Sequence, residues 1–233
     1  FSCVLVYLFG RQLFKSRAAA AAASVLLCLD FLQFAESRIA KLDSYLAFFI
    51  LAGIYFAYLH GHNGISGEKI ISARTVISAI FLGLALSCKL SAVSGIIAVF
   101  VFYIIASKLR DGRVNLKKTI SLIAMYFLII AIVYISAHVL LFFKGIKPSY
   151  LLYRDTLNLH YAGEFHHKNL SGMDRWLLNT KPFWYYWHND AQAKTITAVA
   201  GMGNFIFWWG FLILFLSLIH ISEPTRLLSI SYA

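Results

Sequence analysis

Long apolar blocks separated by short charged segments constrain this chain more than any other feature. The blocks have the composition of membrane spans and cover residues 18–34, 42–59, 75–87, 90–106, 119–143 and 196 onward. A helix needs roughly 20 mostly apolar residues to cross about 30 Å of hydrocarbon. Because 60% of the 233 residues are hydrophobic and only 13% are charged, a soluble core could not bury them all. The chain is therefore predicted to be an all-α, polytopic transmembrane helical bundle.

The distribution of positive charge predicts how the bundle is oriented. A net charge of +11 would also suit a nucleic-acid-binding protein, but no polar segment carries a basic stripe with interleaved aromatic residues. The basic residues concentrate instead in short loops at residues 11–17, 69–74 and 108–118. Short loops rich in Lys and Arg favour the cytoplasmic side, so the turns near Arg38 and Lys89 are predicted to lie outside. Membrane lipid is an expected partner, and nucleic acid is not.

The long loop 144–194 falls on the predicted outer side and is rich in aromatic residues. Such residues are common at membrane interfaces, but aromatic faces combined with hydrogen-bonding side chains also bind sugars. The adjacent His166 and His167 could suggest zinc, yet no spaced carboxylate or cysteine accompanies them,. No metal site is predicted.

Both ends of the chain carry features that affect the domain assignment. Residues 1–10 are apolar but shorter than a span, and no signal-peptide pattern precedes them,. Residues 216–226 read LSLIHISEPTR, which resembles a translated sequencing adapter. A partial transmembrane domain, truncated at both ends, is therefore expected over residues 1–215, followed by a non-native tail over residues 216–233.

Two of the predicted outer turns carry ionisable residues close to the hydrocarbon, where charge is costly without a partner or a role. The first turn contains Arg38 and Asp43, and the second contains Lys89. Structural explanations exist, because Asp43 can cap the following helix and the two cations can extend towards the interface. A guanidinium also binds phosphate in a bidentate geometry, and a lipid-phosphate sugar donor would place its phosphate at this depth. Arg38 and Lys89 are therefore candidates for binding that phosphate.

Four short motifs, in order, resemble the protein O-mannosyltransferase family of GT-C membrane glycosyltransferases. SRIAKLD at residues 37–43 is similar to the family's SRIxLLD, and GLALSCK at residues 83–89 is similar to its GLAxSxK. Gly203-Asn204 with the tryptophan pair 208–209 is similar to GNPxxWW. The loop pattern HxxxSxxxxWxxxxxPxWYY is matched without a gap by His167, Ser171, Trp176, Pro182, Trp184, Tyr185 and Tyr186. The family's usual residues are replaced at Lys168, Met173, Asp174 and Phe205.

The resemblance implies a multi-pass membrane enzyme that transfers mannose from a polyprenyl-phosphate donor to Ser or Thr hydroxyls of an acceptor protein. It would lie in a prokaryotic plasma membrane or in the endoplasmic reticulum, and a dimer is compatible with it. The lipid-linked mannose is a substrate, so no cofactor is implied. The implied substrate contacts in the outer loop are His167, Ser171, Trp176, Trp184 and Tyr185.

The implied reaction needs a carboxylate near the acceptor hydroxyl as general base and positive charge on the departing phosphate. Arg38 and Lys89 suit the second role. Family members carry the catalytic carboxylate in the first outer loop, which would lie upstream of Phe1. The base is therefore expected outside this chain, and the chain expressed alone is expected to be inactive.

Alternatives remain open at this point. Within the same fold, the chain could transfer another lipid-linked sugar, such as aminoarabinose, to a lipid or glycan. A transporter or a non-catalytic membrane subunit would be a different class. Transporters place ionisable or helix-breaking residues at mid-span, facing a path. Here most charged residues lie at the ends of the predicted spans, and Asp30 and His138 are the main exceptions.

Overall fold

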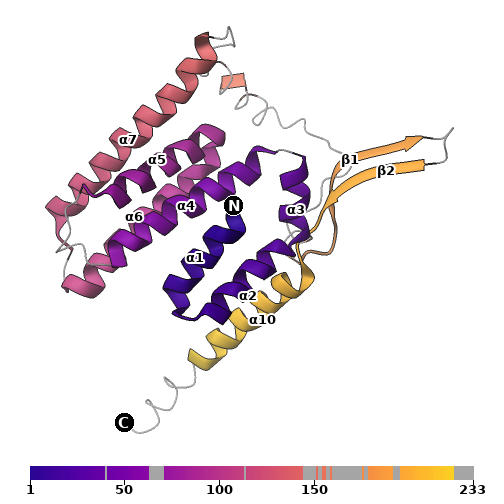
Figure 1. Cartoon of the computed structure of the whole chain (residues 1–233), viewed down its shortest axis with the longest axis horizontal. Coiled ribbons are helices and arrows are strands. Elements are labelled where there is room, and N and C mark those ends of the chain that lie inside the picture. The colour runs from indigo at the N-terminus through magenta and orange to yellow at the C-terminus, as the bar shows by residue number, and fades with distance from the viewer. Residues whose placement is uncertain are drawn as a thin grey trace. The chain divides into compact units, whose positions relative to one another are not determined.

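The computed structural model describes most of the chain. The described ranges are residues 1–39, 41–62, 71–112, 114–143, 178–190 and 195–222, with residues 151, 154, 155, 158 and 175. The chain divides into two compact units, and Figure 1 labels their elements. Unit 1 comprises Phe1–Ala21 and Ala40–Phe165, and unit 2 comprises Ala22–Ile39 and His166–Ala233.

Unit 1 is a bundle of helices in which α5 contacts both α4 and α7 extensively. Its elements are α1 (Ser2–Phe14), the start of α2 (Arg17–Cys28), α4 (Leu42–His62), α5 (Ala73–Cys88), the 3-10 helix η1 (Leu90–Ala92), α6 (Val93–Asp111) and α7 (Leu116–Phe143). Its buried core consists of Ala57, Ala79, Leu82, Ile96, Val99, Tyr103, Leu122, Tyr126 and Ile130. Small residues in this core allow the helices to approach closely, as is typical of membrane bundles.

Glycine and serine lie at close helix contacts of unit 1. A side chain at Gly53 would come within 2.8 Å of Leu82, and one at Gly83 would come within 2.8 Å of Val133. The Ser78 hydroxyl donates to the Gly53 carbonyl at 2.6 Å. In hydrocarbon such polar groups must be satisfied inside the bundle, so α4, α5 and α7 are joined by both packing and hydrogen bonding.

Three helices of the described chain are long and apolar enough to cross a membrane: Leu42–His62, Leu90–Leu109 and Leu116–Val139. Many of their large apolar side chains are exposed on the protein surface, as lipid contact requires. The predicted all-α, polytopic helical bundle is confirmed. His138, one of the two mid-span exceptions, is satisfied locally, because its Nδ1 lies 2.7 Å from the Tyr134 carbonyl oxygen one turn earlier in α7.

The span predicted over residues 18–34 is not straight. It divides into α2 (Arg17–Cys28) and α3 (Phe31–Arg38), which are bent by 55° at the break and are long and apolar enough to cross a membrane only as a pair. Asp30 explains the break, since its backbone is extended and its carboxylate accepts the Gln33 N–H at 3.0 Å as the N-cap of α3. A side chain that bonds its own backbone in this way favours a helix start over a helix interior.

Unit 2 contains a β-hairpin that the sequence analysis did not predict. β1 (Phe183–Asp190) pairs antiparallel with β2 (Thr195–Gly201), and β2 packs against α3. The expectation that the last span begins near Ile196 is therefore wrong. The segment TITAVAG is rich in β-branched residues, which favour strands. The final helix, α10 (Phe205–Ser222), begins only after Asn204, whose Oδ1 accepts the Ile206 N–H at 3.0 Å.

Candidate functional site

Arg38 is the last residue of α3 and lies on an exposed face of that helix. Its guanidinium carbon sits 5.1 Å from the centre of the Phe34 ring, one turn earlier. Residues four apart face the same side of a helix, and a cation over an aromatic face is held there by the ring quadrupole. The guanidinium forms no ion pair with a carboxylate within the part of the chain that the structure describes.

The other side of α3 is held by the hairpin. Leu32 and Glu36 are half-buried, whereas Phe34 and Arg38 are exposed. The Tyr185 hydroxyl donates to Glu36 Oε1 at 2.8 Å, joining positions 149 residues apart in sequence. Two residues of helix correspond to a rotation of about 200°, so the pair 32 and 36 faces away from the pair 34 and 38.

Lys89 follows the C-terminal end of α5 and lies beside the first turn of α4. Its Nζ donates to Asp43 Oδ1 at 2.8 Å, and Lys41 Nζ lies 3.7 Å from the other oxygen of the same carboxylate. Asp43 is inside the first turn of α4, where negative charge also interacts favourably with the helix dipole,. One carboxylate thus faces two cations, and the cluster keeps a formal charge of +1.

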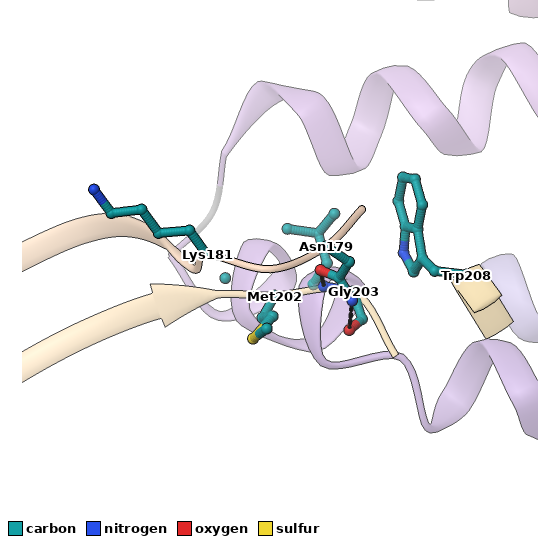
Figure 2. Close-up of a pocket in the computed structure, with 7 residues that line it drawn as sticks. Asn179, Lys181, Met202, Gly203 and Trp208 are labelled. Atoms are coloured by element: carbon teal, nitrogen blue, oxygen red, sulfur yellow. Dashed lines mark hydrogen bonds between the residues drawn. The ribbon is translucent and has the colours of Figure 1, made fainter. Parts of the chain in front are cut away.

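The base of the hairpin is closed by buried polar contacts, which Figure 2 shows. Asn179 is 6% exposed, and its side-chain amide makes two hydrogen bonds to Gly203, donating to the carbonyl at 2.6 Å and accepting the N–H at 3.2 Å. Its backbone adopts φ 51°, a left-handed conformation that asparagine tolerates better than most residues. The indole of Trp208 covers Gly203 on the side where a Cβ would be.

Two pockets adjoin this contact, and they differ in size. The first, lined by Asn179, Lys181, Gly203 and Trp208 among others (Figure 2), has a free volume of about 20 Å³, room for roughly one water molecule,. It is too small for a sugar. The second has a volume of about 320 Å³ and a mainly apolar lining formed by Leu27, Asp30, Leu32, Trp208 and Phe211.

Asp30 connects the start of α3 to the start of α10. While one carboxylate oxygen caps α3, Oδ1 accepts the Asn204 N–H at 3.0 Å. Asn204 in turn donates from Nδ2 to the Leu29 carbonyl at 3.2 Å. The second mid-span exception is therefore a structural carboxylate with both oxygens engaged.

The predicted site residues lie in unit 1, in unit 2 or outside the described residues. Asp43 and Lys89 contact each other in unit 1, whereas Arg38 and Tyr185 both lie around α3 in unit 2. Trp184 is half-buried in β1 opposite Ala200. His167, Ser171 and Trp176 lie outside the described residues, as do Lys168, Met173 and Asp174. Among the described residues, no three His, Cys, Asp or Glu side chains come together as metal ligands.

Sequence reasoning missed two contributors to this region. Glu36 belongs to the charged turn, but nothing in the sequence indicated that its partner would be Tyr185. Asn179 lies in a stretch, LLNTKP, whose only signal is the turn propensity of Asn near Pro. Both contacts join distant segments, which local sequence patterns do not reveal.

These features place the chain in the class of helical integral membrane proteins, with an exposed arginine and a cationic cluster at helix ends. The model of the dolichyl-phosphate-mannose-protein mannosyltransferase family matches residues 1–152. The chain belongs to that family, a family of membrane mannosyltransferases that act on proteins. The match includes Arg38, Asp43 and Lys89, whereas the outer-loop candidates lie beyond it. No curated protein and no solved structure gives a significant match.

Proposed function

We propose that this chain belongs to an enzyme that transfers mannose from a polyprenyl-phosphate donor to Ser or Thr hydroxyls of proteins, on the extracytoplasmic side. The observation that carries the proposal is the family match over residues 1–152. Arg38 and Lys89 are assigned to the donor phosphate. Their role is to stabilise the negative charge that builds up on the phosphate as the bond to the sugar breaks.

The surroundings of Arg38 support its assignment. The guanidinium is exposed and positioned by Phe34, and the nearest acidic residue in sequence, Glu36, is engaged by Tyr185. Among the described residues no ion pair with Arg38 would have to be displaced for a phosphate to accept two parallel hydrogen bonds from it. Such bidentate contacts are among the stronger charge-assisted hydrogen bonds.

The assignment of Lys89 to the donor phosphate is supported by the net positive charge of its cluster. Its side chain is 55% exposed although it contacts Asp43, so one face of the ammonium group can still reach a ligand. The charge of +1 on the cluster attracts an anion.

General-base chemistry is not assigned to a residue of this chain. The carboxylates whose side chains the structure describes are all engaged: Asp30 by two backbone N–H groups, Glu36 by Tyr185, Asp43 by two lysines and Asp155 by Arg154. A general base must instead face the acceptor hydroxyl within hydrogen-bond reach.

Transfer assays on membranes containing the intact protein test the proposal. Polyprenyl-phosphate mannose with labelled sugar is offered with a Ser/Thr-rich peptide, and with the same peptide after Ser and Thr are replaced by Ala. We expect label on the first peptide only. Arg38→Gln should lower transfer at least about tenfold, which corresponds to roughly 1.4 kcal/mol of lost transition-state stabilisation. Lys89→Gln should act in the same direction.

Arg11→Gln is the matched control, because Arg11 is an exposed cation in the last turn of α1, a helix of unit 1 that contributes no residue to the cluster of Lys41, Asp43 and Lys89. It should leave transfer unchanged. Transfer of aminoarabinose but not mannose, or equal activity of Arg38→Gln and the unmodified protein, would contradict the proposal.

A further inference from the structure

The family motif implies that Tyr185 contacts substrate, but its hydroxyl already donates a hydrogen bond to Glu36 within the protein. We infer that Tyr185 is a positioning residue: it holds the short helix α3 on the face opposite Arg38 and thereby fixes the position of the Arg38 side chain. The inference rests on the proposed role of Arg38 as a ligand of the donor phosphate.

The backbone of β1 directs Tyr185 towards α3. Trp184 pairs with Ala200 and Tyr186 pairs with Val199, so Tyr185 is an extra residue in the register. A β-bulge of this kind re-aims a side chain relative to the regular alternation of the strand. Here the bulged residue carries the hydroxyl that bonds to Glu36 at 2.8 Å.

The opposite strand leaves space for the tyrosine ring. A Cβ at Gly201 would lie 2.6 Å from the Tyr185 ring and 2.9 Å from Leu32. Glycine at this position therefore lets the ring, β2 and α3 meet. Tyr185 and Leu32 pack on the same glycine, and Leu32 and Glu36 lie one turn apart on α3.

These contacts hold α3 at two separate points. Asp30 ties its first turn to Asn204, and Glu36 ties its last turn to Tyr185. A helix of eight residues held at both ends can neither slide nor rotate freely. Because Arg38 projects from the face opposite Leu32 and Glu36,, its orientation depends on the hairpin through α3.

Binding of farnesyl phosphate, a short lipid phosphate without sugar, to the intact chain in lipid nanodiscs tests the inference. Tyr185→Phe removes one hydroxyl and should weaken binding about three- to tenfold, the scale of one hydrogen bond. Arg38→Gln should weaken it at least as much. The double variant should be little worse than Arg38→Gln alone, because both changes act through the same guanidinium.

Tyr186→Phe is the matched control: Tyr186 is the neighbouring tyrosine, is 51% exposed and stacks on His188 instead. It should bind as the unmodified protein does. Glu36→Gln keeps an acceptor for the tyrosine and should retain binding, whereas Glu36→Ala should reproduce Tyr185→Phe. The Glu36 pair also gives an answer should Tyr185→Phe fail to fold.

The outcomes separate this inference from the proposed function. Unchanged affinity in Tyr185→Phe, beside a loss in Arg38→Gln, overturns the positioning role. Equal affinity in Arg38→Gln and the unmodified protein overturns the phosphate site instead. In that case amide hydrogen exchange over residues 31–38 decides about Tyr185: faster exchange in Tyr185→Phe but not in Tyr186→Phe supports its hold on α3, and equal exchange overturns it.

Discussion

At the scale of single residues, polar side chains at the hairpin base are matched atom by atom to backbone groups. Asn179 satisfies both the N–H and the carbonyl of Gly203, and Asp30 uses one oxygen for α3 and the other for Asn204. A buried polar group without such a partner costs about 1–3 kcal/mol. Substitutions here are therefore expected to destabilise the fold, because they remove a hydrogen-bond partner, or fill a tightly packed position, that no neighbouring group can replace.

Gly203 gives the first prediction at this scale. A Cβ there would overlap the indole of Trp208, so Gly203→Ala should force the indole or the strand to move. We expect a destabilisation of about 1–3 kcal/mol, seen as a lower midpoint in thermal unfolding of the purified protein. Gly210→Ala in α10 is the control, since a Cβ there meets nothing within 4 Å. It should be neutral or stabilising by up to about 1 kcal/mol; equal effects of the two variants would contradict the packing argument.

At the scale of elements, the break between α2 and α3 depends on one carboxylate with two duties. Asn has a single side-chain oxygen, so Asp30→Asn can serve either the Gln33 N–H or the Asn204 N–H, but not both. Asp30→Ala serves neither. We expect α3 to lose about 0.5–2 kcal/mol of local stability in Asp30→Ala, the range of N-cap losses, and an intermediate amount in Asp30→Asn.

Amide hydrogen exchange over residues 31–38 measures this series. Asp155→Ala removes a carboxylate from an exposed pair with Arg154 and serves as the control, because exposed pairs contribute little. If Asp30→Asn exchanged as slowly as the unmodified protein, the link to Asn204 would have no energetic weight.

The same elements show what the sequence could and could not predict. Apolar blocks of span length predicted α4, α6 and α7 well, because lipid imposes a length and composition that can be counted locally. The hairpin was missed because the segment TITAVAG is as apolar as the start of a membrane-spanning helix. Only its pairing with residues 183–190 makes it a strand. At the candidate site, Arg38 was found by charge and motif. Its hold through Glu36 and Tyr185 joins segments 149 residues apart, for which one sequence carries no signal.

At the scale of the whole molecule, the predicted orientation depends on whether α5 crosses the membrane. α5 has 16 residues, which gives a length of roughly 24 Å at 1.5 Å per residue, less than the hydrocarbon thickness of about 30 Å. Its close packing on α4 and α7 favours a crossing, since a short span buried among longer ones needs less contact with lipid. If α5 does not cross, the segments before and after it lie on one side, and the charge-based orientation fails.

Cysteine labelling in intact cells decides between these arrangements. Single cysteines are introduced at Ile71, before α5, at Ser91, after it, and at Val114, after α6, in a chain whose native cysteines are replaced by serine. All three positions are exposed. The positive loops predict that a membrane-impermeant maleimide labels Ser91→Cys at once, and labels Ile71→Cys and Val114→Cys at least about tenfold less until the membrane is permeabilised. Equal labelling of Ile71→Cys and Ser91→Cys would show that α5 does not cross, and labelling of Val114→Cys instead of Ser91→Cys would reverse the orientation that places Lys89 outside.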